Sequence, residues 1–187
     1  MLILMVGLPG TGKSTLSRAL VERFGGFVID KDVIRPALFG PSHIDYTIEQ
    51  DDFCQEVMLL TAGYLLTRRP ELRVFLDGRP FSREYQRESV LKAAERIRTP
   101  LAVVECVADD ETALARIRRD LESGIHLAAN RTEQLYFEKK RDFERESLKG
   151  PRLTVSSAQE LEMSVIEAEA YLQQIRQRFV PYNQPLP

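Results

Sequence analysis

The sequence of 187 residues contains two cysteines, two histidines and no tryptophan. Cys54 and Cys106 each lie in an apolar stretch and lack the spacing of metal ligands, which excludes a zinc module and a disulfide framework. We therefore expect two reduced, buried thiols. His43 and His126 are isolated in the sequence, and we interpret both as loop residues rather than as ligands or catalytic bases.

An excess of either charge is also missing, because 26 lysines and arginines face 28 aspartates and glutamates. The net charge of −2 argues against a protein that coats long nucleic acid, but not against one that grips a single end. Long hydrophobic runs are absent as well. The run LILMV that precedes the first glycine is too short for a signal peptide or a membrane span. We therefore expect a cytoplasmic protein without a membrane partner.

What remains is an ordinary globular composition, with 43% hydrophobic and 29% charged residues. The length suits one domain with a substantial core, which we place at residues 1–180. Residues 181–187 contain three prolines and should form an irregular C-terminal tail. Internal repeats and low-complexity tracts are not found.

The segment GLPGTGKS, Gly7 to Ser14, follows the apolar run directly and fits the P-loop pattern GxxxxGK[ST]. Its glycines let backbone N–H groups converge on an anion, and a helix that begins near Gly12 adds its positive end. Lys13 would reach the β- and γ-phosphates of ATP or GTP, and the Ser14 hydroxyl would ligate Mg²⁺. The alternative is a glycine loop that binds nothing. The predicted nucleotide-binding residues are Gly7, Leu8, Pro9, Gly10, Thr11, Gly12, Lys13, Ser14 and Thr15.

Short apolar runs alternate with segments of helical periodicity along the whole chain. The predicted strands are residues 2–6, 27–29, 73–77, 101–107 and 152–157. This alternation predicts an α/β fold: a P-loop NTPase three-layer sandwich, with a five-stranded parallel sheet, helices on both faces and a helical lid at about residues 116–131.

Several helix boundaries follow from caps and from the spacing of apolar residues. In the helix at about residues 47–67, Phe53, Val57, Leu60, Tyr64 and Leu65 should face the core. Ser82 should cap a helix that ends near residue 98, Asp109 one that ends at Gly124, and Thr132 one that ends near residue 148. The last helix should span residues 158–179.

Charged side chains stand where the second and third predicted strands end, at the edge where parallel sheets bind ligands. Asp32 is our candidate base that orients an acceptor hydroxyl and accepts its proton, with Arg35 one helical turn further on. Asp30, nearer the strand, competes for this role, and Asp32 could instead cap a short helix and pair with Arg35. Asp77 follows VFL in the manner of a Walker-B-like aspartate that holds Mg²⁺, or alternatively begins a turn.

Arginines supply candidate phosphate contacts. Arg83 and Arg87 are four residues apart and would share a helix face that meets either an anionic substrate or solvent. Arg116, Arg119 and Arg131 flank the irregular segment IHLAANR. A helix–loop–helix with arginines on its inner side is what a lid over ATP requires.

The order GLPGTGKST, DKDVIR, FLDGRPFSR and ARIRRD resembles the small P-loop kinases of the AAA_33 or zeta-toxin-like group, related to the polynucleotide 5′-hydroxyl kinase domain. The resemblance covers residues 1–148. It implies ATP as donor, Mg²⁺ as cofactor, Asp32 and Arg35 as the D-x-x-R motif that activates the acceptor hydroxyl, and Arg116 or Arg119 as the lid arginine. The segment SGIHLAANR departs from the short basic lid of polynucleotide kinases, and no phosphatase or ligase segment is attached. Both departures favour a small hydroxylated acceptor.

We therefore expect an ATP-dependent phosphotransferase that acts on a hydroxyl of a small molecule. The alternatives are a polynucleotide 5′-hydroxyl kinase, a nucleoside monophosphate kinase and a non-catalytic ATP-binding switch protein. The acceptor, the choice between ATP and GTP, the active lid arginine and the oligomeric state stay open at this point.

Overall fold

The computed structural model describes residues 1–123, 130, 132–143 and 151–179. The predictions for the segment IHLAANR except Asn130, for residues 144–150 and for the C-terminal tail lie outside these ranges. The strands are β1 (Leu2–Val6), β2 (Phe27–Asp30), β3 (Val74–Asp77), β4 (Leu101–Val107) and β5 (Leu153–Ser156). They form one sheet in the order β2-β3-β1-β4-β5, and every neighbouring pair is parallel. The predicted five-stranded parallel sheet is confirmed.

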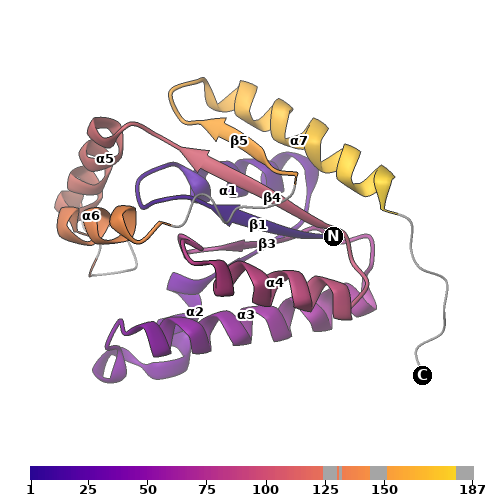
Figure 1. The fold of residues 1–187 in the computed structure, drawn as a ribbon, viewed down its shortest axis with the longest axis horizontal. Helices are drawn as coiled ribbons and strands as arrows, with labels where there is room; N and C mark the ends of the chain where they lie inside the picture. Colours follow the sequence, from indigo (N-terminus) through magenta and orange to yellow (C-terminus); the bar gives the residue numbers. More distant parts are fainter. Residues whose placement is uncertain (124–129, 131, 144–150, 180–187) are drawn as a thin grey trace.

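Helices cover both faces of this sheet, as predicted for a three-layer sandwich (Figure 1). They are α1 (Lys13–Phe24), α2 (Lys31–Phe39), α3 (Ile48–Arg68), α4 (Glu84–Arg96), α5 (Asp110–Ser123), α6 (Glu133–Arg141) and α7 (Leu161–Arg178), with a short 3-10 helix η1 (Pro41–His43). Helices α1 and α7 lie on one face, α3 and α4 on the other, and α5 and α6 lie beyond the carboxyl end of β4 (Figure 1). Among the described helices, none combines the length and the apolar character that a membrane crossing needs.

The central strand β1 contributes side chains to two separate hydrophobic cores, one on each face of the sheet. Its odd-numbered residues Ile3 and Met5 pack with residues of α1 and α7, and its even-numbered residues Leu2 and Leu4 pack with residues of α3 and α4. Side chains of a strand alternate between its two faces, so a strand covered on both sides must be apolar throughout. All five residues of β1 are buried, and β1 therefore holds the following loop rigidly at the middle of the sheet edge.

Three predicted helix boundaries are wrong by one to several residues. Helix α4 begins at Glu84 and its N-cap is Arg83. Ser82, the predicted cap, lies one residue before the N-cap position and is buried. Helix α7 begins at Leu161, because residues Ser156 to Gln159 form a turn in which the Gln159 N–H donates to the Ser156 carbonyl. Helix α6 ends at Arg141 and not near residue 148.

The predicted inner face of α3 is wrong at Phe53, Leu60 and Tyr64, which are at least half exposed, whereas Leu65 packs against the core as predicted and Val57 is partly buried. The buried face is formed by Cys54, Met58, Ala62 and Leu66. Both sets follow helical spacing, so periodicity alone could not separate them. The expectation of buried cysteines is confirmed for Cys54 and Cys106.

Candidate active site

The loop between β1 and α1 has the conformation that its glycines permit. Gly7, Gly10 and Gly12 have φ values of 139°, 80° and 90°, in the region that other residues rarely adopt. A Cβ on Gly7 would lie 2.3 Å from the Cys106 carbonyl oxygen, and one on Gly10 would lie 2.5 Å from the Ala113 carbonyl oxygen. The loop is thus fitted between the end of β4 and α5.

Lys13 is the first residue of α1, with Gly12 as N-cap. Its buried ammonium group donates hydrogen bonds to the carbonyls of Gly7 (2.8 Å) and Leu8 (2.9 Å), so the side chain curls back over the loop. Helix N-termini and convergent backbone N–H groups attract anions. The Lys13 ammonium therefore lies where it can exchange carbonyl partners for phosphate oxygens.

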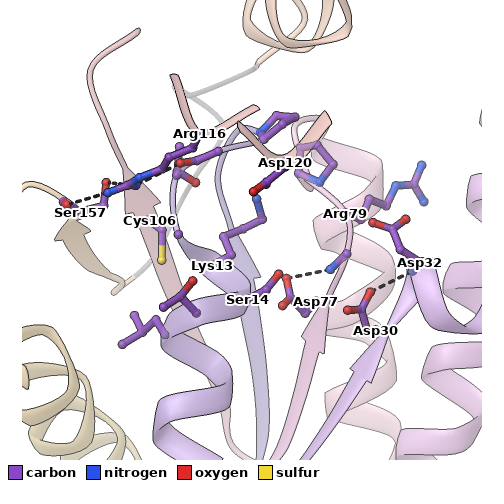
Figure 2. A pocket seen from close by; sticks show the side chains of 18 of the residues that line it. Lys13, Ser14, Asp30, Asp32, Asp77, Arg79, Cys106, Arg116, Asp120 and Ser157 are labelled. Carbon is purple, nitrogen blue, oxygen red and sulfur yellow. Dashed lines mark hydrogen bonds between the residues drawn. The ribbon is translucent and has the colours of Figure 1, made fainter. Parts of the chain in front are cut away.

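The predicted metal ligands Ser14 and Asp77 lie next to each other below Lys13 (Figure 2). Asp77 is buried, and its two carboxylate oxygens accept hydrogen bonds from the Ser17 hydroxyl (3.2 Å) and the Gly78 N–H (2.7 Å). Mg²⁺ prefers hard oxygen ligands, is bound by one or two protein groups and takes its remaining ligands from water and phosphate. A serine hydroxyl and a carboxylate beside the P-loop fit this requirement. The hydrogen bond from the Gly78 N–H shows that Asp77 also begins the turn after β3, which was the alternative interpretation of this aspartate.

Asp30 and Asp77 are register partners at the ends of β2 and β3. Burial raises the pKa of Asp30 to about 6, and the neighbouring Asp77 carboxylate adds to the rise. Asp30 is the N-cap of α2, because its Oδ1 accepts the Asp32 N–H at 2.9 Å. The alternative interpretation of Asp32 is therefore wrong, since Asp30 caps the helix and Arg35 pairs with Asp51 instead.

Asp32 itself lies in the first turn of α2, and its buried Oδ1 lies 3.5 Å from the Lys31 ammonium. This oxygen accepts no hydrogen bond from the described residues. Helix α2 continues past Pro36 to Phe39, so Pro36 does not stop it. Arg35, on the next turn from Asp32, is 3% exposed, and its guanidinium lies 4.7 Å from the ring centroid of Tyr46.

Arg116 faces the opposite side of the P-loop from Asp32 (Figure 2). It donates to the Gly10 carbonyl at 3.1 Å and to the Ser157 hydroxyl at 2.8 Å, and so bridges the loop to the end of β5. Arg119, one turn further along α5, lines the same cavity and is exposed. The third lid candidate, Arg131, lies outside the described residues.

These groups surround one cavity of about 660 Å³ at the carboxyl edge of the sheet. The predicted site residues that line it are Pro9, Gly10, Thr11, Gly12, Lys13, Ser14, Thr15, Asp32, Arg35, Asp77, Arg116 and Arg119. Gly7 and Leu8 do not line it. Gly7 packs on the Cys106 backbone, and Leu8 is buried in a small core with Ala113 and Ile117 of α5.

The arginines after β3 do not act as predicted from their spacing. Arg87 is buried and donates to the Phe81 carbonyl at 2.6 Å, so its role is structural. Arg83 is not helical and pairs with Asp142 at 3.3 Å. Arg79 is buried at the cavity wall, where it binds Asp52 and Gln55 of α3.

Among the cavity residues that sequence reasoning missed are Lys31, Tyr46, Asp51 and Lys139. Lys31 lies between Asp30 and Asp32 in the motif DKD, and this position next to two candidate site carboxylates could have indicated a cavity residue. Asp51 belongs to α3, twenty residues from Lys31, and no local pattern links the two. Lys139 lies in a strongly charged helix where any lysine reads as surface charge.

Comparisons with known proteins agree with this geometry. The family model AAA_33, described as an AAA domain, matches residues 2–135. No curated protein sequence matches the chain.

Solved structures share the fold at low sequence identity. A gluconokinase from Sinorhizobium meliloti is 21% identical, with a TM-score of 0.65 over 94% of this chain and 93% of its own. Kti12 from Chaetomium thermophilum, solved with ADP-AlF3, is 15% identical, with a TM-score of 0.70 over 96% and 100%. The APS kinase from Mycobacterium tuberculosis, solved with AMPPNP and APS, is 14% identical, with a TM-score of 0.69 over 92% and 96%.

The fold is thus one that known P-loop kinases share, and the family match extends from β1 through the P-loop and α5 into α6. Because the family model matches more than half of the chain, at residues 2–135, the chain belongs to the AAA_33 family.

Proposed function

We propose that the protein is a phosphotransferase that moves the γ-phosphate of ATP to a hydroxyl of a small molecule, with Asp32 as the base. One observation carries this proposal. Asp32 lines the cavity that the P-loop also lines, and its Oδ1, 3.5 Å from the Lys31 ammonium, accepts no hydrogen bond within the described part of the chain. The ammonium compensates the charge of this carboxylate but leaves it without a close donor, which an acceptor hydroxyl would supply.

The side chains divide the reaction between them. Lys13 would leave the Gly7 and Leu8 carbonyls and hold the transferring phosphate from the P-loop side. Mg²⁺, held by Ser14 and Asp77, would neutralise charge on the phosphate oxygens. Asp32 would accept the hydroxyl proton as the new oxygen–phosphorus bond forms and the bond to the ADP leaving group breaks. Arg119, which lines the cavity, would stabilise the charge that develops on the phosphate.

Recognition of the nucleotide base would fall to the other end of the cavity. Arg116, Ser157, Gln159 and Leu161 line that end, and Figure 2 shows Arg116 and Ser157 on the far side of Lys13 from Asp32. The nucleotide and the acceptor would then approach Lys13 from opposite sides. Such an approach would meet the in-line requirement of phosphoryl transfer.

The test is ADP release from Mg·ATP with pooled small hydroxylated acceptors, and with a 5′-hydroxyl oligonucleotide in a separate reaction. Stimulation by a small-molecule pool is expected, and Asp32→Asn should lower kcat by roughly 10²–10⁴ while ATP binding stays intact. Stimulation by the oligonucleotide alone would favour a polynucleotide 5′-hydroxyl kinase. If Asp32→Asn weakens ATP binding instead, Asp32 is a metal ligand or a structural group. ATP binding without any stimulation would favour a nucleotide-dependent switch.

A further inference from the structure

The cavity carries an excess of positive charge that the chain as a whole does not have. Eight lysines and arginines line it against five aspartates, while the net charge of the protein is −2. Lys13, Arg116 and Arg119 lie where nucleotide phosphates would balance them. At the Asp32 end of the cavity, Lys31 pairs with Asp51 and Arg79 pairs with Asp52. The third cation there, Lys139 of α6, needs a different explanation.

Lys31 and Arg35 share one carboxylate. The Lys31 ammonium lies 2.7 Å from Asp51 Oδ1, and the Arg35 guanidinium pairs with the same oxygen. Lys31 is 8% exposed and Arg35 3%, so solvent compensates neither charge well. The Arg35 Nε–H is buried and lacks a hydrogen-bond partner among the described residues. Lys31 has a second carboxylate partner in Asp32 at 3.5 Å, so the two cations are balanced by two carboxylates, and the Arg35 Nε–H remains as a donor without a hydrogen bond.

Lys139 of α6 brings a further cation to this end of the cavity, where it also lines a small pocket with Asp51 and Arg79. It is partly buried, lines the cavity, and makes no hydrogen bond or ion pair with any residue in the described ranges. Burial lowers the pKa of Lys139, and the nearby cations Lys31, Arg79 and Arg83 lower it further. The Asp142 carboxylate partly offsets this lowering. The next residue, Lys140, pairs with Asp110 at 2.5 Å. An unpaired ammonium among cations costs stability unless a ligand supplies negative charge.

We propose that the acceptor carries an oxyanion group, a carboxylate, sulfate or phosphate, in addition to its reactive hydroxyl, and that this group binds between Lys31 and Lys139 with the Arg35 Nε–H as a further donor. This inference rests on the proposed function, whose acceptor class it narrows. Lys31 and Asp32 are adjacent, so an anion held by Lys31 would place a neighbouring hydroxyl beside Asp32 Oδ1. The hydroxyl and the anion of the acceptor would then satisfy the unpaired donor and acceptor of this wall together.

The site can be tested without knowledge of the acceptor. The protein is saturated with Mg·AMPPNP, so that the P-loop is occupied, and is titrated with sulfate, inorganic phosphate or acetate by calorimetry at constant ionic strength. Binding of one sulfate or phosphate per chain is expected if the natural group is tetrahedral, and binding of acetate in preference to both if it is a carboxylate. No binding of any of the three anions would overturn the proposal.

Two variants locate the bound anion. Lys139→Gln should weaken its binding by about tenfold or more, the usual effect of losing a charged hydrogen bond. Lys92→Gln is the matched control, because Lys92 is exposed on α4 and its ammonium pairs only loosely with Glu88 at 3.7 Å. Equal affinity in both variants would place the anion elsewhere and overturn the proposal. Lys139→Gln relieves like-charge repulsion, so the variant should keep its fold.

A second measurement separates this inference from the proposed function. ADP release is compared for glucose, gluconate and glucose 6-phosphate, and for glycerol, glycerate and glycerol phosphate. Faster turnover of an acidic member than of its neutral parent supports both ideas. Faster turnover of the neutral parent overturns the anion subsite and leaves the kinase function standing. Anion binding that depends on Lys139, with no acceptor-stimulated ADP release, supports the subsite and counts against the kinase function.

Discussion

Asp30 and Asp77 stand directly opposite each other, at the last paired positions of two parallel strands. A Cβ on Gly78, the residue after Asp77, would lie 2.4 Å from Asp30 Oδ1. The two carboxyl groups are thus held close together in a largely buried edge of the sheet, and a Mg²⁺ ion and nucleotide would arrive at the same edge. Such repulsion between buried acids is typical of functional sites rather than of structural ones.

The first prediction concerns stability and pH. The pKa of Asp30 is about 6 in the folded protein and 3.8 in the unfolded chain, so the folded state holds this proton over a wider pH range. Stability from this group is therefore present below pH 4 and is lost as the pH rises through 6. Asp30→Asn keeps an N-cap for α2 and should stabilise the nucleotide-free protein by about 1–3 kcal/mol at pH 8. Urea unfolding measures the difference.

The same variant at pH 3 is the control, because both states of the wild type are then largely protonated at this position. The stabilisation should fall to near zero there. An equal effect at both pH values would show that the pKa of Asp30 is not raised in the folded protein.

The second prediction concerns the fit of the P-loop against α5. Gly10→Ala would place a methyl group 2.5 Å from the Ala113 carbonyl oxygen at a φ of +80°, so the loop must move. We expect ATP affinity to fall by more than about tenfold, since overpacking and left-handed strain cost roughly 1–3 kcal/mol together. Fluorescence titration with a labelled ATP analogue measures the affinity.

Gly25→Ala is the matched control. Gly25 has a φ of +75° at the end of α1, but an added Cβ would meet nothing within 4 Å. This variant should lose stability through backbone strain and keep its ATP affinity. If both variants lose affinity equally, the effect comes from general destabilisation and not from the loop.

The third prediction separates the two lid arginines. Arg116 already holds the Gly10 carbonyl and Ser157, so Arg116→Ala should raise the Kd of ATP about tenfold with little change in kcat. Arg119 is exposed to the cavity, and Arg119→Ala should lower kcat by about 10²–10³. Arg118→Ala is the control between them, because Arg118 pairs with Glu133 and does not line the cavity. The reverse pattern, a kcat defect in Arg116→Ala alone, would assign the phosphate contact to Arg116.

The fold was predictable because its signals are local. Buried parallel strands read as continuous apolar runs, and LILMV and LAVVECV are such runs. The P-loop was equally recognisable from the sequence, because Gly7, Gly10 and Gly12 adopt positive φ values that other residues rarely adopt. Those two features alone place Lys13 and the ends of the neighbouring strands at one edge of the sheet.

Packing direction and long-range ion pairs were not predictable. Helix α3 is apolar on more than one side, and only its contact with the sheet decides that Met58 is buried and Tyr64 exposed. The acceptor wall depends on Asp51, whose carboxylate meets Lys31 and Arg35 of another helix. The N-cap of α2 is Asp30 and not Asp32. The choice depends on where β2 ends, and sequence patterns give such a boundary only within a few residues.

The fourth prediction concerns that wall. Asp51 neutralises part of the charge of two cations that are almost fully buried, so Asp51→Ala leaves Arg35 without its carboxylate and Lys31 with Asp32 alone, at 3.5 Å. Loss of one member of a buried ion pair costs about 3–5 kcal/mol, and the Asp51 side chain is 13% exposed, which places the expected loss near the lower end. Thermal or urea unfolding measures this loss. Adding Lys31→Met to Asp51→Ala should restore part of the stability, because one of the two orphaned charges is then removed. Additive losses in the double variant would show that Asp51 contributes packing and not charge compensation.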